Sequence, residues 1–579
     1  MTEYELNLDI EELEKRTNKD YLTTKTMLNE NSPEYLNLAD GDKTALAHLV
    51  KAAYILEKIN KKLDNCHNIP FEKFLSQEIK KGNRRAELTK ILYDAQKGVC
   101  ALDREANMIE LAKNVHQTLG KGVYPEDLDK AEFQSIILKM LKNGKIKEVK
   151  TILNQRSVVE RNGDELIGID YIDKFHEEFG LMAEELENAA KVSTNKDFNE
   201  YLELQAKALR KADPMLDAYA DKKWAELQNT PLEFTITREN YSDELTESVI
   251  ENAELKSLLE KHCIKPVGKD FLGGRVGIVN KKGTEAILKV KEFLPIMAQN
   301  MPFNDEYIQN IIAVKNSKQT MVDVDLVTVS GNVGEFRAGI TLAENLPNDD
   351  KLSLTIGGGR RNVYHRQIRF ITSEDARKKL QARLDAVLYK EQHKYYNDEA
   401  DHWFTIGHEN AHSLGPKSGS ESLGKYKSII EENKADMTSL AMLDILEENG
   451  MYSREQKNQI IVTYAADNML SSKPVLSQAH RVRSVMQNYY FLKEGALKIS
   501  ADGILTVIIE KIVPAAQKML KEIIRVQIDC DFNKGEKYVL ENFQWTPEMD
   551  VIAQNLKKVS KTLNGKVEEP LAEKLLKSC

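Results

Sequence analysis

One stretch constrains this chain more than any other: residues 404–412 read Phe-Thr-Ile-Gly-His-Glu-Asn-Ala-His, which contains the pattern His-Glu-x-x-His. On a helix, His408 and His412 are one turn apart on the same face, so both imidazoles can bind one metal ion. Glu409 follows His408 directly and can face a water molecule at that metal. Because so short a pattern also arises by chance, a metal site requires a third ligand.

A candidate third ligand stands 20 residues after His412. Residues 413–416, Ser-Leu-Gly-Pro, are expected to end the first helix, and a second helical pattern covers 428–450. That pattern contains Glu432 and Asp436, one turn apart and directed toward the apolar side of the helix. Carboxylates in such a place need partners. A metal bound by Glu432, with Asp436 accepting a hydrogen bond from a ligand imidazole, provides them.

The alternative is an exposed helix whose acidic residues only face water, as charged runs commonly do. Two His and one Glu with an open coordination position are, however, the ligand set of catalytic zinc sites, and the order of the two motifs is similar to that of thermolysin-like zinc peptidases. We therefore expect one Zn²⁺ per chain, bound by His408, His412 and Glu432. Glu409, which is not a ligand, is expected to act as the general base.

Composition and charge exclude several other classes. The net charge of −9 is spread along the chain, which argues against nucleic acid as a partner. No apolar run is long enough for a membrane span, and the first residues show no signal peptide, so a cytoplasmic protein is expected. That expectation agrees with five scattered cysteines, predicted to be reduced thiols: Cys66, Cys100, Cys263, Cys530 and Cys579.

Helical periodicity dominates residues 1–230, where apolar residues recur at three- and four-residue steps over 43–63, 71–96, 126–143, 171–190 and 197–228. The texture then changes to short β-like runs separated by turn residues, at 233–237, 275–279, 322–329 and 353–356. The remaining residues are again helical and contain the metal motifs. The sequence thus predicts a mainly α fold with a smaller, barrel-like β-rich subdomain, in three regions: 1–230, 231–372 and 373–579.

A third motif follows the two metal motifs. Residues 477–483 read Ser-Gln-Ala-His-Arg-Val-Arg and open a further helix. From the residues alone, His480 is either an ordinary surface histidine or a donor to the oxyanion that amide hydrolysis forms.

Together the motifs resemble those of the dipeptidyl peptidase III family of zinc peptidases, in its shorter bacterial-type version. The resemblance rests on Gly-His-Glu-x-x-His-x-Leu-Gly-Pro, on Glu-Glu-x-x-Ala-Asp, and on Gln-Ala-His with a Gly fifteen residues later. It extends from the helical run at 201–209 to about Gly495. It implies two lobes separated by a cleft, one of them helical and zinc-bearing, and the release of dipeptides from the N-termini of short peptides.

Residue by residue, the resemblance implies zinc ligands at His408, His412 and Glu432 and a general base at Glu409. It makes His480 a stabiliser of the oxyanion. The family's Glu-x-Tyr segment matches 239–241, so that Tyr241 would donate to the oxyanion and Glu239 would bind the α-ammonium group of the substrate. The family's Asn-x-Pro-Asn segment matches 345–348, which makes Asn345 and Asn348 contacts of the first peptide residues.

The chain departs from the family in two places. The best-known members have one extra residue between the ligand histidines, whereas this chain has the plain spacing. The arginine expected four residues after the site histidine is Ser484 here, and the neighbouring Arg483 is expected to bind substrate in its place. A zinc aminopeptidase or oligopeptidase with another cut site therefore stays open, as does a non-catalytic peptide-binding protein. Glu409 discriminates against the last, because a binding protein needs no general base.

Overall fold

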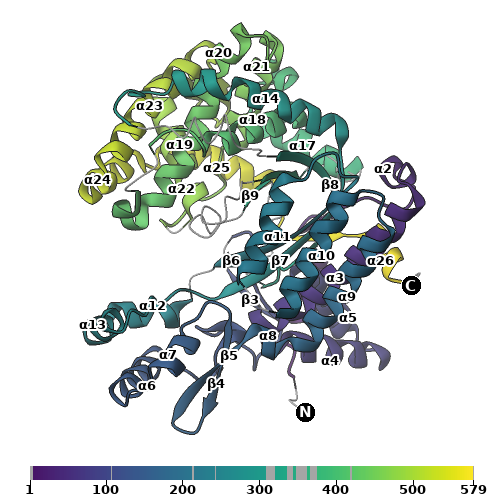
Figure 1. Ribbon diagram of the computed structural model, residues 1–579. Coiled ribbons are helices and arrows are strands. Elements are labelled where there is room, and N and C mark those ends of the chain that lie inside the picture. Colours follow the sequence, from purple (N-terminus) through teal and green to yellow (C-terminus); the bar gives the residue numbers. More distant parts are fainter. Residues whose placement is uncertain are drawn as a thin grey trace.

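The computed structural model describes most of the chain: residues 4–105, 107–211, 214–240, 243–307, 320–334, 343–346, 361–365, 374–416, 420–476 and 478–577. Within these residues the chain is mainly helical, with small sheets (Figure 1). None of the described helices combines the length and the apolar composition that crossing a bilayer requires.

The N-terminal region is helical, as its periodicity predicts, but several of the predicted helices are shorter. Gly82, at φ +80°, ends one helix after residue 80, because glycine adopts this left-handed conformation without strain. Pro214 likewise begins a new helix. The helices are α1 (Ile10–Thr17), α2 (Pro33–Leu36), α3 (Asp40–Asp64), α4 (Asn68–Lys80), α5 (Arg84–Gln96), α6 (Lys130–Lys142), α7 (Ile146–Ile152), α8 (Tyr171–Lys174), α9 (His176–Val192), α10 (Lys196–Lys211) and α11 (Pro214–Glu226).

The β-rich region forms one five-stranded sheet in the order β6-β7-β8-β10-β9. All neighbours are antiparallel except β8 and β10. The described strands make an open sheet with β6 and β9 at its edges, so the predicted barrel is wrong; the run expected at 353–356 lies outside the described residues. The strands are β6 (Leu232–Asn240), β7 (Asp270–Val279), β8 (Thr320–Ser330), β9 (Ala343–Leu346) and β10 (Arg361–His365).

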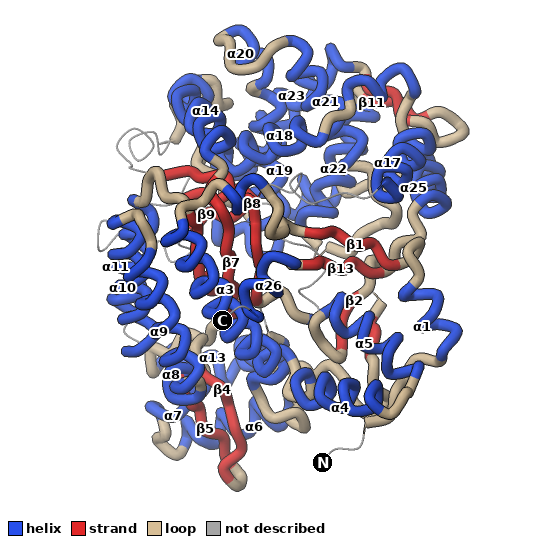
Figure 2. The backbone as a smooth tube through the Cα atoms, turned by 90° about the vertical axis from the view of Figure 1, so that its right-hand side faces the viewer, coloured by secondary structure: helices blue, strands red, loops and turns tan. Residues whose placement is uncertain are grey.

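This sheet shares a hydrophobic core with the N-terminal helices. Helix α3 packs on β7 and β8, α9 packs on α3, and α10 packs on α9. The end of the chain returns to this first core: β13 (Asn564–Glu568) pairs in parallel with β1 (Leu22–Thr26), and α26 (Pro570–Lys577) packs against α3 (Figure 2). Smaller hairpins pair β2 (Cys100–Leu102) with β3 (Met108–Glu110), and β4 (Ser157–Asn162) with β5 (Glu165–Asp170). The region boundaries at 230 and 372 stay a prediction.

A second hydrophobic core unites the C-terminal helices with α14 (Lys281–Gln299), which follows β7 in the chain. In Figures 1 and 2 these helices lie together above the sheet. They are α17 (Glu374–Val387), α18 (Asp398–Ala411), α19 (Lys427–Ala441), α20 (Leu443–Glu448), α21 (Arg454–Asp467), α22 (Ala479–Lys493), α23 (Ile509–Asp529), α24 (Phe532–Asn542) and α25 (Pro547–Val559). A hairpin of β11 (Leu497–Ile499) and β12 (Leu505–Val507) joins this core. Helices α12 (Glu244–Glu251) and α13 (Ala253–Lys261) belong to the first core and pack on α6.

Helices α18 and α19 carry the metal motifs and lie unusually close together at one point. A side chain at Gly407 would place its Cβ 2.3 Å from the hydroxyl oxygen and 3.2 Å from the Cβ of Ser439, so any residue larger than glycine would displace Ser439. The same hydroxyl donates a hydrogen bond of 3.2 Å to the carbonyl of Phe404. Glycine at 407 therefore allows the ligands on α18 to approach those on α19.

The helix predicted over 428–450 is divided into α19 and α20. Helix α19 ends at Ala441. The carbonyl of Ala441 accepts a hydrogen bond of 3.2 Å from the side chain of Gln517 on α23. The division leaves both predicted carboxylates, Glu432 and Asp436, on α19.

Candidate metal centre

The two histidines of the first motif face each other at the C-terminal end of α18. Regular helix ends at Ala411, but His412 keeps helical dihedral angles (φ −59°, ψ −27°), so its ring stays on the face of His408, one turn later and edge-on to it. The Nε2 atoms of His408 and His412 are 3.2 Å apart. Both rings thus direct the same type of nitrogen at one point.

The other ring nitrogen of each histidine contacts a carboxylate. His408 Nδ1 lies 2.6 Å from Asp436 Oδ1, the contact expected of Asp436, and His412 Nδ1 lies 2.8 Å from Glu431 Oε1. A carboxylate accepts hydrogen bonds, so each Nδ1 carries a proton and each Nε2 is left to hold either a second proton or a metal ion. Two Nε2 atoms this close need a proton or a metal ion between them, and histidines that bind metals have this outer carboxylate arrangement.

Glu432 completes the group from α19. Its Oε2 atom is 3.4 Å from His408 Nε2 and 4.0 Å from His412 Nε2, and the three ligand atoms lie within 4.8 Å of one another. Ligand atoms of a tetrahedral zinc site are about 3.3 Å apart, given metal–ligand distances near 2.0 Å. Oε2 is also buried without a hydrogen-bond donor among the described residues. His408, His412 and Glu432, hereafter the metal group, therefore fit a zinc ion.

Electrostatics at the metal group favour a cation. Burial alone would raise the pKa of Glu432, but the adjacent histidines hold it at about 2. Burial would likewise lower the pKa of His408, but Asp436 and Glu432 raise it to about 10. Negative charge that retains a proton on a buried imidazole this strongly also attracts a divalent cation in place of that proton.

Asp436 is itself held by a buried network. The Arg483 guanidinium forms an ion pair with Asp436 Oδ2, and both Tyr464 OH and Gln487 Nε2 donate to the same oxygen at 3.1 Å. Burial would raise the pKa of Asp436, but Arg483 and His408 hold it at about 2. Arg483, predicted to bind substrate, thus positions Asp436 and through it His408; only 17% of its side chain is exposed.

Two functional contacts were missed by the sequence reasoning. Glu431 accepts the hydrogen bond of His412 Nδ1 through Oε1, and its Oε2 atom accepts a hydrogen bond of 2.9 Å from Gln527 Nε2. Lys434 is buried and donates hydrogen bonds of 2.8 Å to the carbonyls of Ala411 and Leu414, so its charge caps the C-terminal end of α18. A signal for Glu431 was present: two ligand imidazoles require two outer acceptors, and Asp436 supplies only one.

The predicted catalytic residues lie beside the metal group where they are described. Glu409 is partly exposed, and its negative charge contributes to the raised pKa of His408. His480, on the first turn of α22, places Nδ1 3.3 Å from Glu432 Oε2 and leaves 69% of its side chain exposed. The structure thus brings a residue 48 positions beyond the metal ligand to the open side of the group.

The remaining predicted residues are described in part. Glu239 lies near the end of β6, where its backbone pairs with Phe271 on β7. Asn345 lies on β9, the edge strand that runs beside α18, and its backbone pairs with Asn362. The side chains of both residues, and the whole of Tyr241 and Asn348, lie outside the described residues.

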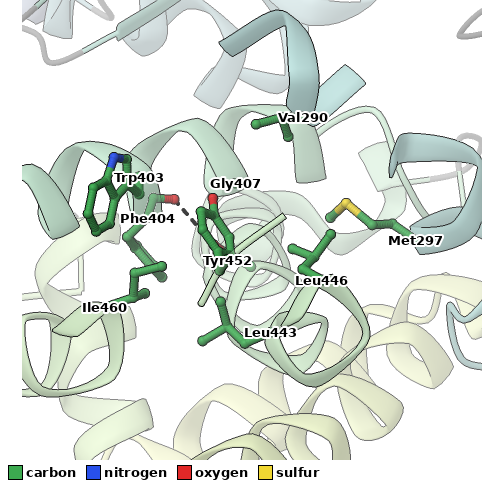
Figure 3. Close-up of a pocket in the computed structure, with 10 residues that line it drawn as sticks. Val290, Met297, Trp403, Phe404, Gly407, Leu443, Leu446, Tyr452 and Ile460 are labelled. Atoms are coloured by element: carbon green, nitrogen blue, oxygen red, sulfur yellow. Dashed lines mark hydrogen bonds between the residues drawn. The ribbon is translucent and has the colours of Figure 1, made fainter. Parts of the chain in front are cut away.

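An apolar cavity lies between α14, α18, α19, α20 and α21, and Gly407, which precedes the ligand His408, is part of its wall (Figure 3). Its walls contain no acid, base or histidine; they are formed by Val290, Met297, Trp403, Phe404, Gly407, Ser439, Leu443, Leu446, Tyr452 and Ile460. This cavity supplies no ligand and no proton acceptor to the site.

The sequence was compared with protein families and with known proteins. No protein-family model matches the chain. "Nudix hydrolase 3" of Arabidopsis thaliana is 23% identical over 479 residues, which are 79% of this chain but only 58% of that protein. The chain therefore spans less than three fifths of that relative's length, and this match does not assign the relative's activity to the chain.

Two solved structures resemble nearly the whole chain. The structure of DPP III from Caldithrix abyssi has a TM-score of 0.78 at 20% identity and covers 97% of this chain and 100% of its own. Dipeptidyl-peptidase III from Corallococcus sp. strain EGB has a TM-score of 0.72 at 19% identity, with coverages of 97% and 98%. The chain therefore has the dipeptidyl peptidase III fold, as the resemblance of its motifs predicts.

Proposed function

We propose that this chain is a zinc-dependent peptidase that releases dipeptides from the N-termini of short peptides. One observation carries the proposal: both ligand imidazoles have Nδ1 on a carboxylate, while both Nε2 atoms converge with Glu432 on one point. This arrangement is typical of catalytic metal sites with three protein ligands. The likeness to two structures named as dipeptidyl peptidase III supports a peptidase among such enzymes.

Each residue around the metal group has a separate role in the proposed hydrolysis. A bound zinc ion would act as a Lewis acid and would lower the pKa of a water molecule toward 7. Glu409 takes the proton of the attacking water and later gives it to the leaving amine. His480 and Tyr241 donate hydrogen bonds to the oxyanion. Asp436 and Glu431 keep the two imidazoles oriented throughout.

The edge of the sheet offers a place for the peptide. Strand β9 is the last strand of the five and lies beside α18. An edge strand presents unpaired backbone groups, to which an extended peptide can add as a further strand. Bound there, a peptide would pass the metal group, between two lobes formed by the first and the second hydrophobic core. Asn345 and Asn348 would contact its first residues.

An exopeptidase must also recognise a terminus. A free α-ammonium group is best recognised by a carboxylate, since a charge-assisted hydrogen bond is stronger than a neutral one. Glu239 provides this group in the proposal. Short peptides are thus the proposed partners, and the absence of nucleic-acid and membrane partners and the cytoplasmic location remain predictions of the sequence.

The test compares three forms of one short peptide: free, N-acetylated and C-terminally amidated, with fragment masses as the readout. The proposal predicts that the free peptide loses its first two residues, that amidation changes little, and that acetylation nearly abolishes cleavage. Release of single residues would indicate an aminopeptidase instead. Equal cleavage of the acetylated and free forms would indicate an oligopeptidase. If no peptide were cleaved, the result would indicate a non-catalytic peptide-binding protein.

A further inference from the structure

A second cluster of metal-binding side chains lies in the N-terminal region, next to α4 and α6 in the chain, two helices that lie below the sheet in Figure 1 whereas α18 lies above it. Cys66 and His67 end the short connection between α3 and α4, and Glu126 stands in the turn before α6. His67 Nε2 is 3.2 Å from both carboxylate oxygens of Glu126, and Cys66 Sγ is 4.0 Å from Glu126 Oε2. The described chain brings together a thiol, an imidazole and a carboxylate here.

These separations suit one small cation. Three ligand atoms, one from each residue, lie within 4.8 Å of one another. With zinc–sulfur distances near 2.3 Å and zinc–nitrogen or zinc–oxygen distances near 2.0 Å, ligand atoms of a tetrahedral site are about 3.3 to 3.7 Å apart. The Glu126 side chain is 49% exposed and is therefore free to adjust its carboxylate toward a bound cation.

The surroundings of His67 hold its Nε2 toward the cluster. The hydroxyl of Tyr4 lies 3.1 Å from Nδ1 of His67, as an outer partner of a metal-binding imidazole does. The Tyr4 ring is itself fixed in an aromatic group, with its centroid 5.3 Å from that of Phe71 and 5.5 Å from that of Phe74. Only 16% of the His67 side chain is exposed, so the imidazole has little freedom to turn away.

We propose that Cys66, His67 and Glu126 form a second metal site, which binds a zinc-like divalent cation with solvent in the fourth position. A thiolate and an imidazole select borderline-soft cations such as Zn²⁺ and Co²⁺ over Mg²⁺ or Ca²⁺. The bound cation joins the α3–α4 connection to the turn before α6. By joining two separate segments, it stabilises the N-terminal region.

Binding of the cation is coupled to a proton. A cysteine binds a metal ion as its thiolate, so the thiol must lose its proton. When the cation binds, the S–H bond breaks, the metal–sulfur bond forms and the proton passes to solvent. The site should therefore bind more tightly as the pH rises.

The test uses Co²⁺ as a spectroscopic probe and Zn²⁺ for stoichiometry, on the full chain. Only the second site contains a sulfur ligand, so a thiolate-to-cobalt charge-transfer band reports it alone. We expect two zinc ions per chain, and one in Cys66→Ser and in Glu126→Gln. Cys263→Ser, which alters another exposed cysteine, should retain both ions and the band. Glu432→Ala should lose the other ion and keep the band, which separates this proposal from the proposed function.

A second readout does not depend on the variants folding alike. Zinc should protect Cys66 from alkylation by iodoacetamide at least tenfold, while Cys263 reacts at the same rate with and without zinc. Cobalt loading without the thiolate band, or equal alkylation of Cys66 with and without zinc, would overturn the proposal and leave His67 and Glu126 as a simple ion pair.

Discussion

Glu431 receives the imidazole of His412 at 2.8 Å, although the residue beside it, Glu432, is the one that faces the metal position. Neighbouring residues on a helix point about 100° apart, so these two carboxylates reach opposite sides of the same ring. Burial would raise the pKa of Glu431, but Lys434 and His412 hold it well below its ordinary range. The ionised Glu431 thus fixes the tautomer and the orientation of His412.

We expect Glu431→Gln to lower zinc affinity by about 10- to 100-fold, because a neutral amide is a weaker acceptor for the ligand imidazole. Competition with a chelator measures the change. Glu448→Gln, at an exposed position on α20, is the control and should bind zinc normally. Unchanged affinity in Glu431→Gln would mean that His412 is oriented by other contacts.

Arg483→Met tests whether Arg483 positions Asp436 or binds substrate. Removing one partner of a buried ion pair leaves the other charge uncompensated, at a cost of about 3–5 kcal/mol. We expect a lower thermal midpoint together with weaker zinc binding. Arg481→Met is the matched control, since its guanidinium donates to Ser472 and Gln478 and forms no ion pair within the described part of the chain. A raised KM at unchanged stability would instead support the substrate role that the sequence predicts for Arg483.

The two predictions show what the sequence could and could not supply. The spacing of His408 and His412 follows from helical geometry alone, and Glu432 and Asp436 could be predicted because carboxylates on an apolar face need partners. Whether Glu431 or Asp436 receives a given imidazole depends on how α18 and α19 approach each other. That approach is set by Gly407 against Ser439, a contact between helices without a local signal.

The same reasoning separates the parts of the fold. Helices were predictable from periodicity because their hydrogen bonds are local. The order of the sheet was not, because strand pairing joins distant segments, and the predicted barrel is an open sheet. The pairing of β1 with β13 is the extreme case. Leu22 lies opposite Asn564, and no sequence pattern in either segment indicates the other as its partner.

His480→Ala should lower kcat by about 100-fold or more and change KM little, if His480 donates to the oxyanion and not to the ground-state substrate. Steady-state kinetics on one peptide measures both constants, and Tyr241→Phe should behave in the same way. His176→Ala, an exposed histidine on α9, is the control. A large rise in KM at normal kcat would assign His480 to substrate binding.

Asp401 provides a prediction on pH and stability. Burial and the nearby Asp467 raise the pKa of Asp401 to about 6, so folding favours its neutral form. Its charge therefore costs stability above pH 6, by up to about 3 kcal/mol, and costs nothing below the ordinary pKa near 3.9. Asp401→Asn should raise the thermal midpoint at pH 7.5, and the gain should vanish near pH 4. Asp164→Asn, in an exposed turn, should show no such pH dependence.

The central claim, that the metal group hydrolyses peptides with Glu409 as the base, is tested most directly by Glu409→Gln. Zinc content and peptide turnover are measured on the same preparation. Because Glu409 is not a ligand, we predict one zinc ion retained at the metal group and turnover reduced by roughly 100-fold or more. Full zinc occupancy with activity within a few-fold of the unaltered chain would contradict the claim.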